Sequence, residues 1–169
     1  MTFLLRFDRD QVSYWASRYS YSIDETLIEP ISLRARAAGY LTKADFLELC
    51  YWKSPRILPQ ARRNSEAFIQ AVTRTALSTP SEQLRVEVLT LLRGVGWPVA
   101  SVILHFAHAE PYPILDFRAL WSLNCEDIPY NFDYWWRFTQ YCRQLAQECQ
   151  VSMRVLDRAL WQYSKENQG

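Results

Sequence analysis

The chain is short of glycine, and this limits the folds that are open to it. It has four glycines in 169 residues, too few for a β-sandwich or barrel, whose many tight turns need residues with positive φ. No segment shows the convincing alternation of apolar and polar residues that marks a half-buried strand. Charged residues make up only 22% of the chain and apolar residues 49%, a balance typical of a folded protein. The sequence therefore predicts an all-α protein of about eight to ten helices.

Capping residues and apolar spacing place several of these helices. The segment from Thr42 to Ser54 opens with a capping box and ends before a proline, which predicts one helix. Apolar and aromatic residues at helical spacing predict further helices over residues 10–19 and 60–77, and two over residues 131–165 with a break near residues 150–152.

A clear helix start lies at residues 79–82. Thr79 is a suitable N-cap, Pro80 suits the first helical position, and Glu82 completes the capping box. We expect this helix to end at Leu92. Its predicted buried face consists of Leu84, Val88, Leu91 and Leu92.

Positive charge is concentrated in one part of the chain, although the whole carries a net charge of only +1. Residues 34–74 hold eight basic and three acidic side chains, a local net charge of +5. A local basic face can hold a phosphate backbone even when the whole protein is nearly neutral. An ordinary solvated helix face has the same pattern, so charge alone leaves both interpretations open.

The cysteines and the N-terminus indicate where the protein works. None of the four cysteines, Cys50, Cys125, Cys142 and Cys149, forms a C-x-x-C pair, so their spacing fits neither a zinc site nor an iron–sulfur cluster. We expect core thiols in a reducing compartment, and no metal or other cofactor. The N-terminal stretch up to Arg6 is too short for a signal peptide, and the chain has no apolar run of about 18 residues. A soluble cytoplasmic protein without membrane contact is therefore expected.

The most informative segment is Gly94–Val95–Gly96, which lies between two predicted helices. Pro98 suits the first turn of the second helix. A glycine turn before a helix N-terminus exposes backbone N–H groups, which bind an anion such as a phosphodiester with help from the helix dipole. Such a contact does not depend on base sequence. An ordinary αα-hairpin turn has the same pattern, so the two glycines alone do not decide between these interpretations.

The chain from Leu92 to Arg118 resembles the helix-hairpin-helix DNA glycosylase superfamily, which includes endonuclease III and the adenine glycosylases. The shared elements are Leu92, Gly94–Val95–Gly96, Ala100, the apolar helix of residues 102–107, and Ile114–Leu115–Asp116, with twenty residues from Gly96 to Asp116. The resemblance implies a single all-α domain over residues 1–169, built as two interleaved helical lobes. It also implies a helix-hairpin-helix at about residues 80–107 and double-stranded DNA as the partner.

By this resemblance Asp116 is the catalytic residue. Hydrolysis of an N-glycosidic bond builds positive charge on the sugar, and a nearby carboxylate stabilises that charge. The same carboxylate can align or deprotonate the attacking water. Asp116 also suits the N-cap of a helix that begins at Phe117. The two roles are compatible, because a capping carboxylate is held rigidly.

Three features depart from the family pattern. Bifunctional members carry a lysine two residues after the second hairpin glycine, which attacks the sugar to form a Schiff base, and this chain has Pro98 there. Pro98 also removes one N–H from the phosphate site. Arg118 replaces a small polar residue, and its side chain can hold a phosphate or pair with Asp116. The iron–sulfur cysteines of some members are absent.

Further DNA contacts are predicted near the hairpin. Lys53 and Arg56 follow two aromatic residues at a helix end, where they can contact DNA or interact with the helix C-terminal dipole. Trp97 either packs on the hairpin or touches DNA. The predicted DNA-binding residues are therefore Gly94, Val95, Gly96, Trp97, Arg118, Lys53 and Arg56.

Together these features predict a monomeric, monofunctional DNA N-glycosylase-like protein of base-excision repair, cytoplasmic and nucleoid-associated if bacterial. It would hydrolyse the glycosidic bond of a damaged base and would lack Schiff-base lyase activity. Two alternatives stay open. One is a non-catalytic helix-hairpin-helix DNA-binding protein, and the other is a helical protein-interaction domain whose surface aromatics contact a partner.

Overall fold

The computed structural model describes residues 2–125 and 129–169. All regular structure in these ranges is helical, with ten α-helices and two short 3-10 helices, which confirms the predicted all-α class. The chain forms two compact units. One contains both ends of the chain, up to Tyr21 and from Pro111 onward, and the other contains Ser22–Glu110. That the two fold as a single domain stays a prediction.

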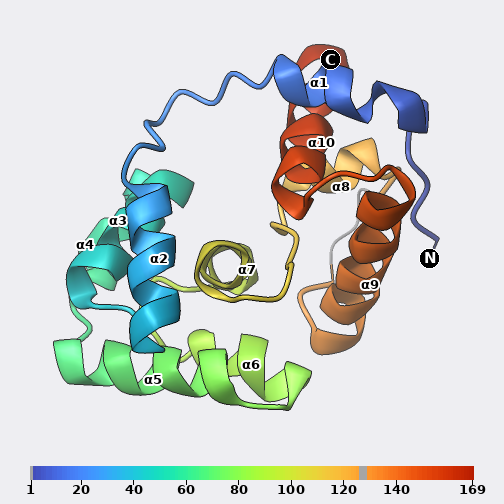
Figure 1. The fold of residues 1–169 in the computed structure, drawn as a ribbon. Coiled ribbons are helices and arrows are strands. Elements are labelled where there is room, and N and C mark those ends of the chain that lie inside the picture. Colours follow the sequence, from blue (N-terminus) through green and yellow to red (C-terminus); the bar gives the residue numbers. More distant parts are fainter. Residues whose placement is uncertain (1, 126–128) are drawn as a thin grey trace. The chain divides into compact units, whose positions relative to one another are not determined.

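The unit formed by the two chain ends is built around its last helix. Its elements are η1 (Arg9–Gln11), α1 (Val12–Ser17), α8 (Phe117–Ser122), α9 (Phe132–Glu148) and α10 (Met153–Asn167). Helix α10 packs against α1, α8 and α9 (Figure 1). The core includes the fully buried ring of Trp135, which stacks on Tyr112 at a centroid distance of 5.7 Å.

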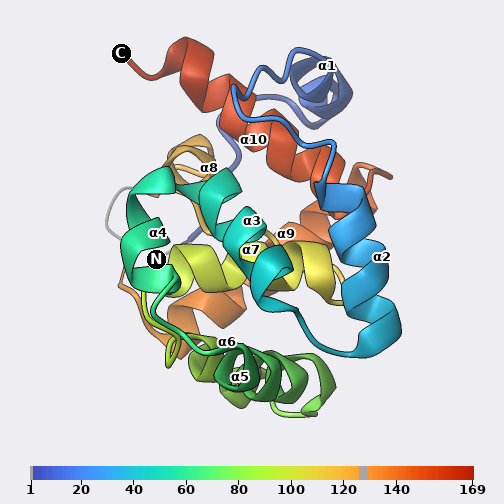
Figure 2. The same cartoon turned by 90° about the vertical axis from the view of Figure 1, so that its left-hand side faces the viewer.

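The unit of residues 22–110 surrounds one apolar helix. Its elements are α2 (Ile28–Ala38), α3 (Lys43–Lys53), η2 (Pro55–Ile57), α4 (Leu58–Ala61), α5 (Glu66–Ser78), α6 (Glu82–Leu89) and α7 (Trp97–Ala107). Helix α7 contacts α2, α3 and α6, and Figures 1 and 2 show it in the middle of this unit. Eight of its eleven residues are buried, as expected of a helix that is apolar on all sides.

Helix α3 and the two tail helices lie where the sequence predicts them. The Thr42 hydroxyl accepts a hydrogen bond from the Asp45 amide, and α3 ends at Lys53 with Ser54 as its C-cap. The predicted break in the tail is confirmed, because α9 ends at Glu148 and Ser152 caps α10. The segment of residues 10–19 is helical over a shorter range than predicted.

The single helix predicted over residues 60–77 is wrong. Helix α4 ends at Ala61, and α5 begins at Glu66 with Ser65 as its N-cap. The cause is Asn64, whose side chain donates a hydrogen bond to the Ala61 carbonyl. A short polar side chain that bonds to nearby backbone in this way favours a turn over a continuous helix.

The predicted start and buried face of α6 are also corrected. Ser81 caps this helix, and Thr79 instead ends α5. The buried face holds Arg85, Val86 and Leu89, while the predicted core residues Leu84 and Leu91 are 46% and 63% exposed. The reason is the Arg85 guanidinium, which donates to the carbonyls of Ala76 and Thr79 at the end of α5 (2.8 and 2.5 Å). This turns α6 so that a charged residue takes a core position.

The four cysteines are free thiols, and Cys50, Cys125 and Cys142 are buried while Cys149 is half-buried. Burial raises the pKa of the Cys50 thiol to about 12 and also raises the pKa of the other three. The three buried thiols are therefore core groups of low reactivity. No helix in the described ranges combines the length and the apolar character needed to cross a membrane.

Candidate functional site

The hairpin consists of α6, the seven residues Thr90–Gly96, and α7. The chain leaves α6 through short-range turns, and the Val95 amide donates to the Leu92 carbonyl at 3.0 Å. The Val95 side chain is 7% exposed, so it anchors the turn in the core of its unit. Val95 therefore positions the turn by packing.

The two hairpin glycines have different roles. Gly94 has a φ of +85°, and a Cβ there would lie 3.2 Å from both the Ile57 carbonyl oxygen and the Ala61 nitrogen. Gly94 thus allows both a left-handed backbone and close contact with α4. Gly96 is exposed and has a φ of −97°. The nearest atom to its Cβ position is Pro98 Cδ at 3.8 Å, so the space in front of Gly96 is open.

Asn64 holds the hairpin in place, a role that the sequence analysis missed. Its side-chain oxygen accepts from the Arg93 amide at 2.9 Å, and its side-chain nitrogen donates to the Arg93 carbonyl at 3.0 Å. Asn64 is 4% exposed, so water does not compete for these bonds. The sequence does contain a sign of a turn here, because an asparagine stands directly before the capping serine in Arg-Arg-Asn-Ser-Glu.

The N-terminus of α7 begins directly at the hairpin. Gly96 is the N-cap, Trp97 and Pro98 follow, and the Ala100 amide makes the first bond back to the Gly96 carbonyl (2.9 Å). The amides of the first turn have no carbonyl one turn earlier within their own helix. Pro98 has no N–H to offer, so this turn has one backbone donor fewer than usual. Trp97 itself is half-buried.

Asp116 is the N-cap of α8. Its Oδ1 accepts a hydrogen bond from the Arg118 amide at 2.9 Å, and the residue is half-buried. The capping role that the sequence allowed is therefore present. This bond fixes the position of one carboxylate oxygen at the start of the helix. Asp116 belongs to the unit with the chain ends, and the hairpin belongs to the other unit.

The Arg118 guanidinium lies over aromatic rings. Its central carbon is 5.1 Å from the centroid of Phe117 and 5.6 Å from that of Trp161. Trp161 is itself contacted edge-on by Tyr19 and Tyr21, at centroid distances of 5.3 and 5.4 Å. Within the described ranges, no ion pair joins the Arg118 guanidinium to a carboxylate. The sequence left two roles open for the Arg118 side chain, holding a phosphate or pairing with Asp116. The structure does not show the pairing with Asp116.

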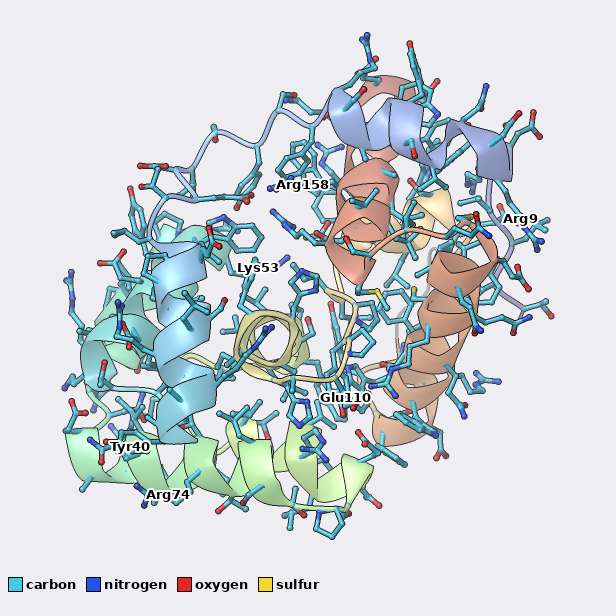
Figure 3. All side chains as sticks on the ribbon, in the orientation of Figure 1. Arg9, Tyr40, Lys53, Arg74, Glu110 and Arg158 are labelled. Carbon is cyan, nitrogen blue, oxygen red and sulfur yellow. The ribbon has the colours of Figure 1, made fainter. Side chains whose placement is uncertain are left out.

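Lys53 and Arg56 lie on either side of the join between α3 and η2. Lys53 is the last residue of α3 (Figure 3), and Arg56 is an exposed residue of η2. The neighbour of Arg56, Ile57, has its carbonyl oxygen against Gly94. The backbone of Arg56 is therefore close to the hairpin.

The described part of the chain has no group of three His, Cys, Asp or Glu residues placed to hold a metal ion. Comparisons of the chain with models of known protein families, with curated proteins and with solved structures find no match. The resemblance to the glycosylases thus depends on the residues from Leu92 to Arg118.

Proposed function

We propose that this protein binds duplex DNA through the hairpin and the N-terminus of α7. The observation that carries the proposal is the open space in front of Gly96, directly at a helix start. An extended, exposed glycine lets a phosphate approach the backbone amides closely, and the helix dipole favours the negative charge. Gly94 and Asn64 support the proposal because they fix the turn before the ligand arrives.

We further propose that Asp116 hydrolyses the N-glycosidic bond of a damaged base. A half-buried carboxylate held by the Arg118 amide is positioned to stabilise a positively charged sugar and to align water. Pro98 stands where a Schiff-base lysine would be needed, so the reaction is monofunctional. The protein would act as a monomer on cytoplasmic, nucleoid DNA.

The DNA-binding proposal is tested with Gly96→Asp and a matched Gly96→Ala control. Both side chains fit the open space and the backbone conformation at this position. The aspartate places a negative charge where the phosphate would sit, so duplex binding should be lost. The alanine variant adds a Cβ to the open space without a charge, so it should weaken binding only in part. Binding of a fluorescent duplex is measured by anisotropy from low to physiological salt. Equal binding by wild type and Gly96→Asp would refute the proposal.

A non-catalytic DNA-binding protein is the second candidate. Its support is the bond from the Arg118 amide to Asp116, because a helix cap alone explains why an aspartate lies there. Incubation with duplexes that carry uracil, hypoxanthine, oxidised or alkylated bases separates the two candidates. Release of a free base supports the enzyme, and binding without release from any of these duplexes supports the second candidate.

A further inference from the structure

Four arginines surround the part of the fold that supports the hairpin turn. Arg56, Arg62, Arg63 and Arg93, here called the arginine tract, are all exposed. Their backbones meet at Gly94, which directly follows Arg93. The Gly94 Cβ position lies 3.2 Å from the Ile57 oxygen, 3.2 Å from the Ala61 nitrogen and 3.5 Å from Gln60 Cβ. Arg56, Arg62 and Arg93 are thus chain neighbours of residues at this contact, and Arg63 lies two residues from Ala61.

The backbone that carries the tract is held by side chains from other elements. Lys43 Nζ donates to the carbonyls of Arg62 and Asn64, at 2.9 and 2.7 Å. Asn64 in turn bonds to both backbone polar groups of Arg93. The Lys43 amide is bound by the Glu66 carboxylate at 3.0 Å. Because these bonds order the backbone around Arg62, Arg63 and Arg93 in advance, binding a ligand there requires ordering of the arginine side chains.

The charges of the tract are not compensated by carboxylates. Elsewhere in the same unit, Arg34 pairs with Asp45 and Arg85 with Glu82. In the described ranges no ion pair involves an arginine of the tract, and the one side-chain hydrogen bond found there joins Arg63 to the neutral amide of Gln60 at 3.3 Å. A group of four positive charges on neighbouring segments of backbone attracts a polyanion.

We propose that the arginine tract binds successive phosphates of the DNA strand that reaches the hairpin. This inference rests on the proposed function, because a phosphate bound at Gly96 fixes the position of the DNA strand relative to the tract. Arginine suits the role because its planar guanidinium forms two parallel hydrogen bonds with a phosphate. The contacts are to the backbone, so they add affinity without base preference. The tract would hold the duplex along α4 in a fixed orientation relative to the hairpin.

The test is the salt dependence of duplex binding by the double variant Arg62→Gln/Arg63→Gln. Each phosphate contact contributes a slope of about 0.9 to the plot of log affinity against log salt, so losing two should lower the slope by about 1.8. Affinity at about 0.1 M salt should fall at least about tenfold. Both side chains are exposed, so the fold should survive, and circular dichroism and thermal melting check this.

The matched control is Arg36→Gln/Arg74→Gln, which removes the same charge from exposed positions on α2 and α5. Arg74 lies over the ring of Tyr40 at 4.7 Å (Figure 3). This control should keep the wild-type slope. Equal slope losses in both double variants, or an unchanged slope in Arg62→Gln/Arg63→Gln, would overturn the inference. Failure of the proposed function gives a different result, because Gly96→Asp would then bind like the wild type.

Discussion

The side chain of Asn64 satisfies both backbone polar groups of Arg93, which lies 29 residues further along the chain. The same side chain also binds the Ala61 carbonyl. One buried amide therefore ends α4 and fixes the turn that leads into α7. The position of the candidate phosphate site depends on this residue, although Asn64 itself is too buried to contact a ligand.

Replacing Asn64 with alanine should destabilise the protein. The change removes three hydrogen bonds and leaves both backbone polar groups of Arg93 without their partner, while the Ala61 carbonyl keeps the bond from the backbone amide of residue 64. We expect a loss of about 2–4 kcal/mol in the free energy of unfolding. Urea denaturation measures it, with Asn167→Ala as the control. Asn167 is exposed and makes one side-chain bond, to Tyr163, so its loss should stay below about 0.5 kcal/mol.

Alanine should be costly at one hairpin glycine and nearly neutral at the other. Gly94→Ala forces a Cβ into a left-handed backbone and to within 3.2 Å of two backbone atoms, so it should cost about 2–3 kcal/mol of stability. Gly96→Ala meets no such contact. Alanine is a poorer N-cap than glycine but restricts the unfolded chain more, so stability should change by at most about 1 kcal/mol. Thermal melting of both variants checks this, and similar melting temperatures would contradict the roles assigned to them.

The parts of the fold that the sequence predicts correctly are those set by residues close together in the chain. The start of α3 could be read from the sequence because Thr42 and its bonding partner Asp45 are three residues apart. The errors arise where a side chain acts on distant backbone. Asn64 ends α4 by binding the Ala61 carbonyl, and its bonds to Arg93, 29 residues further along the chain, hold it in that position. Arg85 turns α6 by binding the end of α5. Helical periodicity in a single segment contains no information about such partners.

The candidate site likewise has parts that could be predicted from the sequence and parts that could not. The turn at Gly94 and the cap at Asp116 were predictable, since each depends on residues within a few positions. The arginine tract was not, because it exists only once α4 packs against Gly94. The excess of basic residues in this region was visible in the sequence. Which of them lie beside the hairpin, and which are paired as Arg34 is with Asp45, required the structure.

The thiols should resist modification in the native state. Burial raises the pKa of Cys50 to about 12, so at pH 8 almost none of it is thiolate, the form that reacts. Cys149 is half-buried while the other three are buried, so it should react first with a disulfide reagent. All four should react on unfolding in guanidinium chloride. Mass spectrometry of the labelled protein gives the order, and rapid native labelling of Cys50 or Cys142 would contradict the burial.

Asp116→Asn separates the catalytic role of Asp116 from its capping role. Asparagine keeps the size of aspartate and an oxygen that can accept from the Arg118 amide, so stability should fall by at most about 1 kcal/mol. The negative charge and the base are lost, so base release should slow by roughly 10² to 10⁴. DNA affinity should hold or rise slightly, because one anion near the phosphates is removed.

Asp116→Ala is the comparison that isolates the cap. It removes both the cap and the charge, so it should cost about 0.5–2 kcal/mol and slow base release as much as Asp116→Asn does. Single-turnover release from a substrate duplex, measured with the melting temperature of each variant, distinguishes the outcomes. If Asp116→Asn releases base at the wild-type rate, Asp116 serves only as the cap of α8. If the rate falls while the melting temperature holds, its carboxylate acts on the reacting sugar.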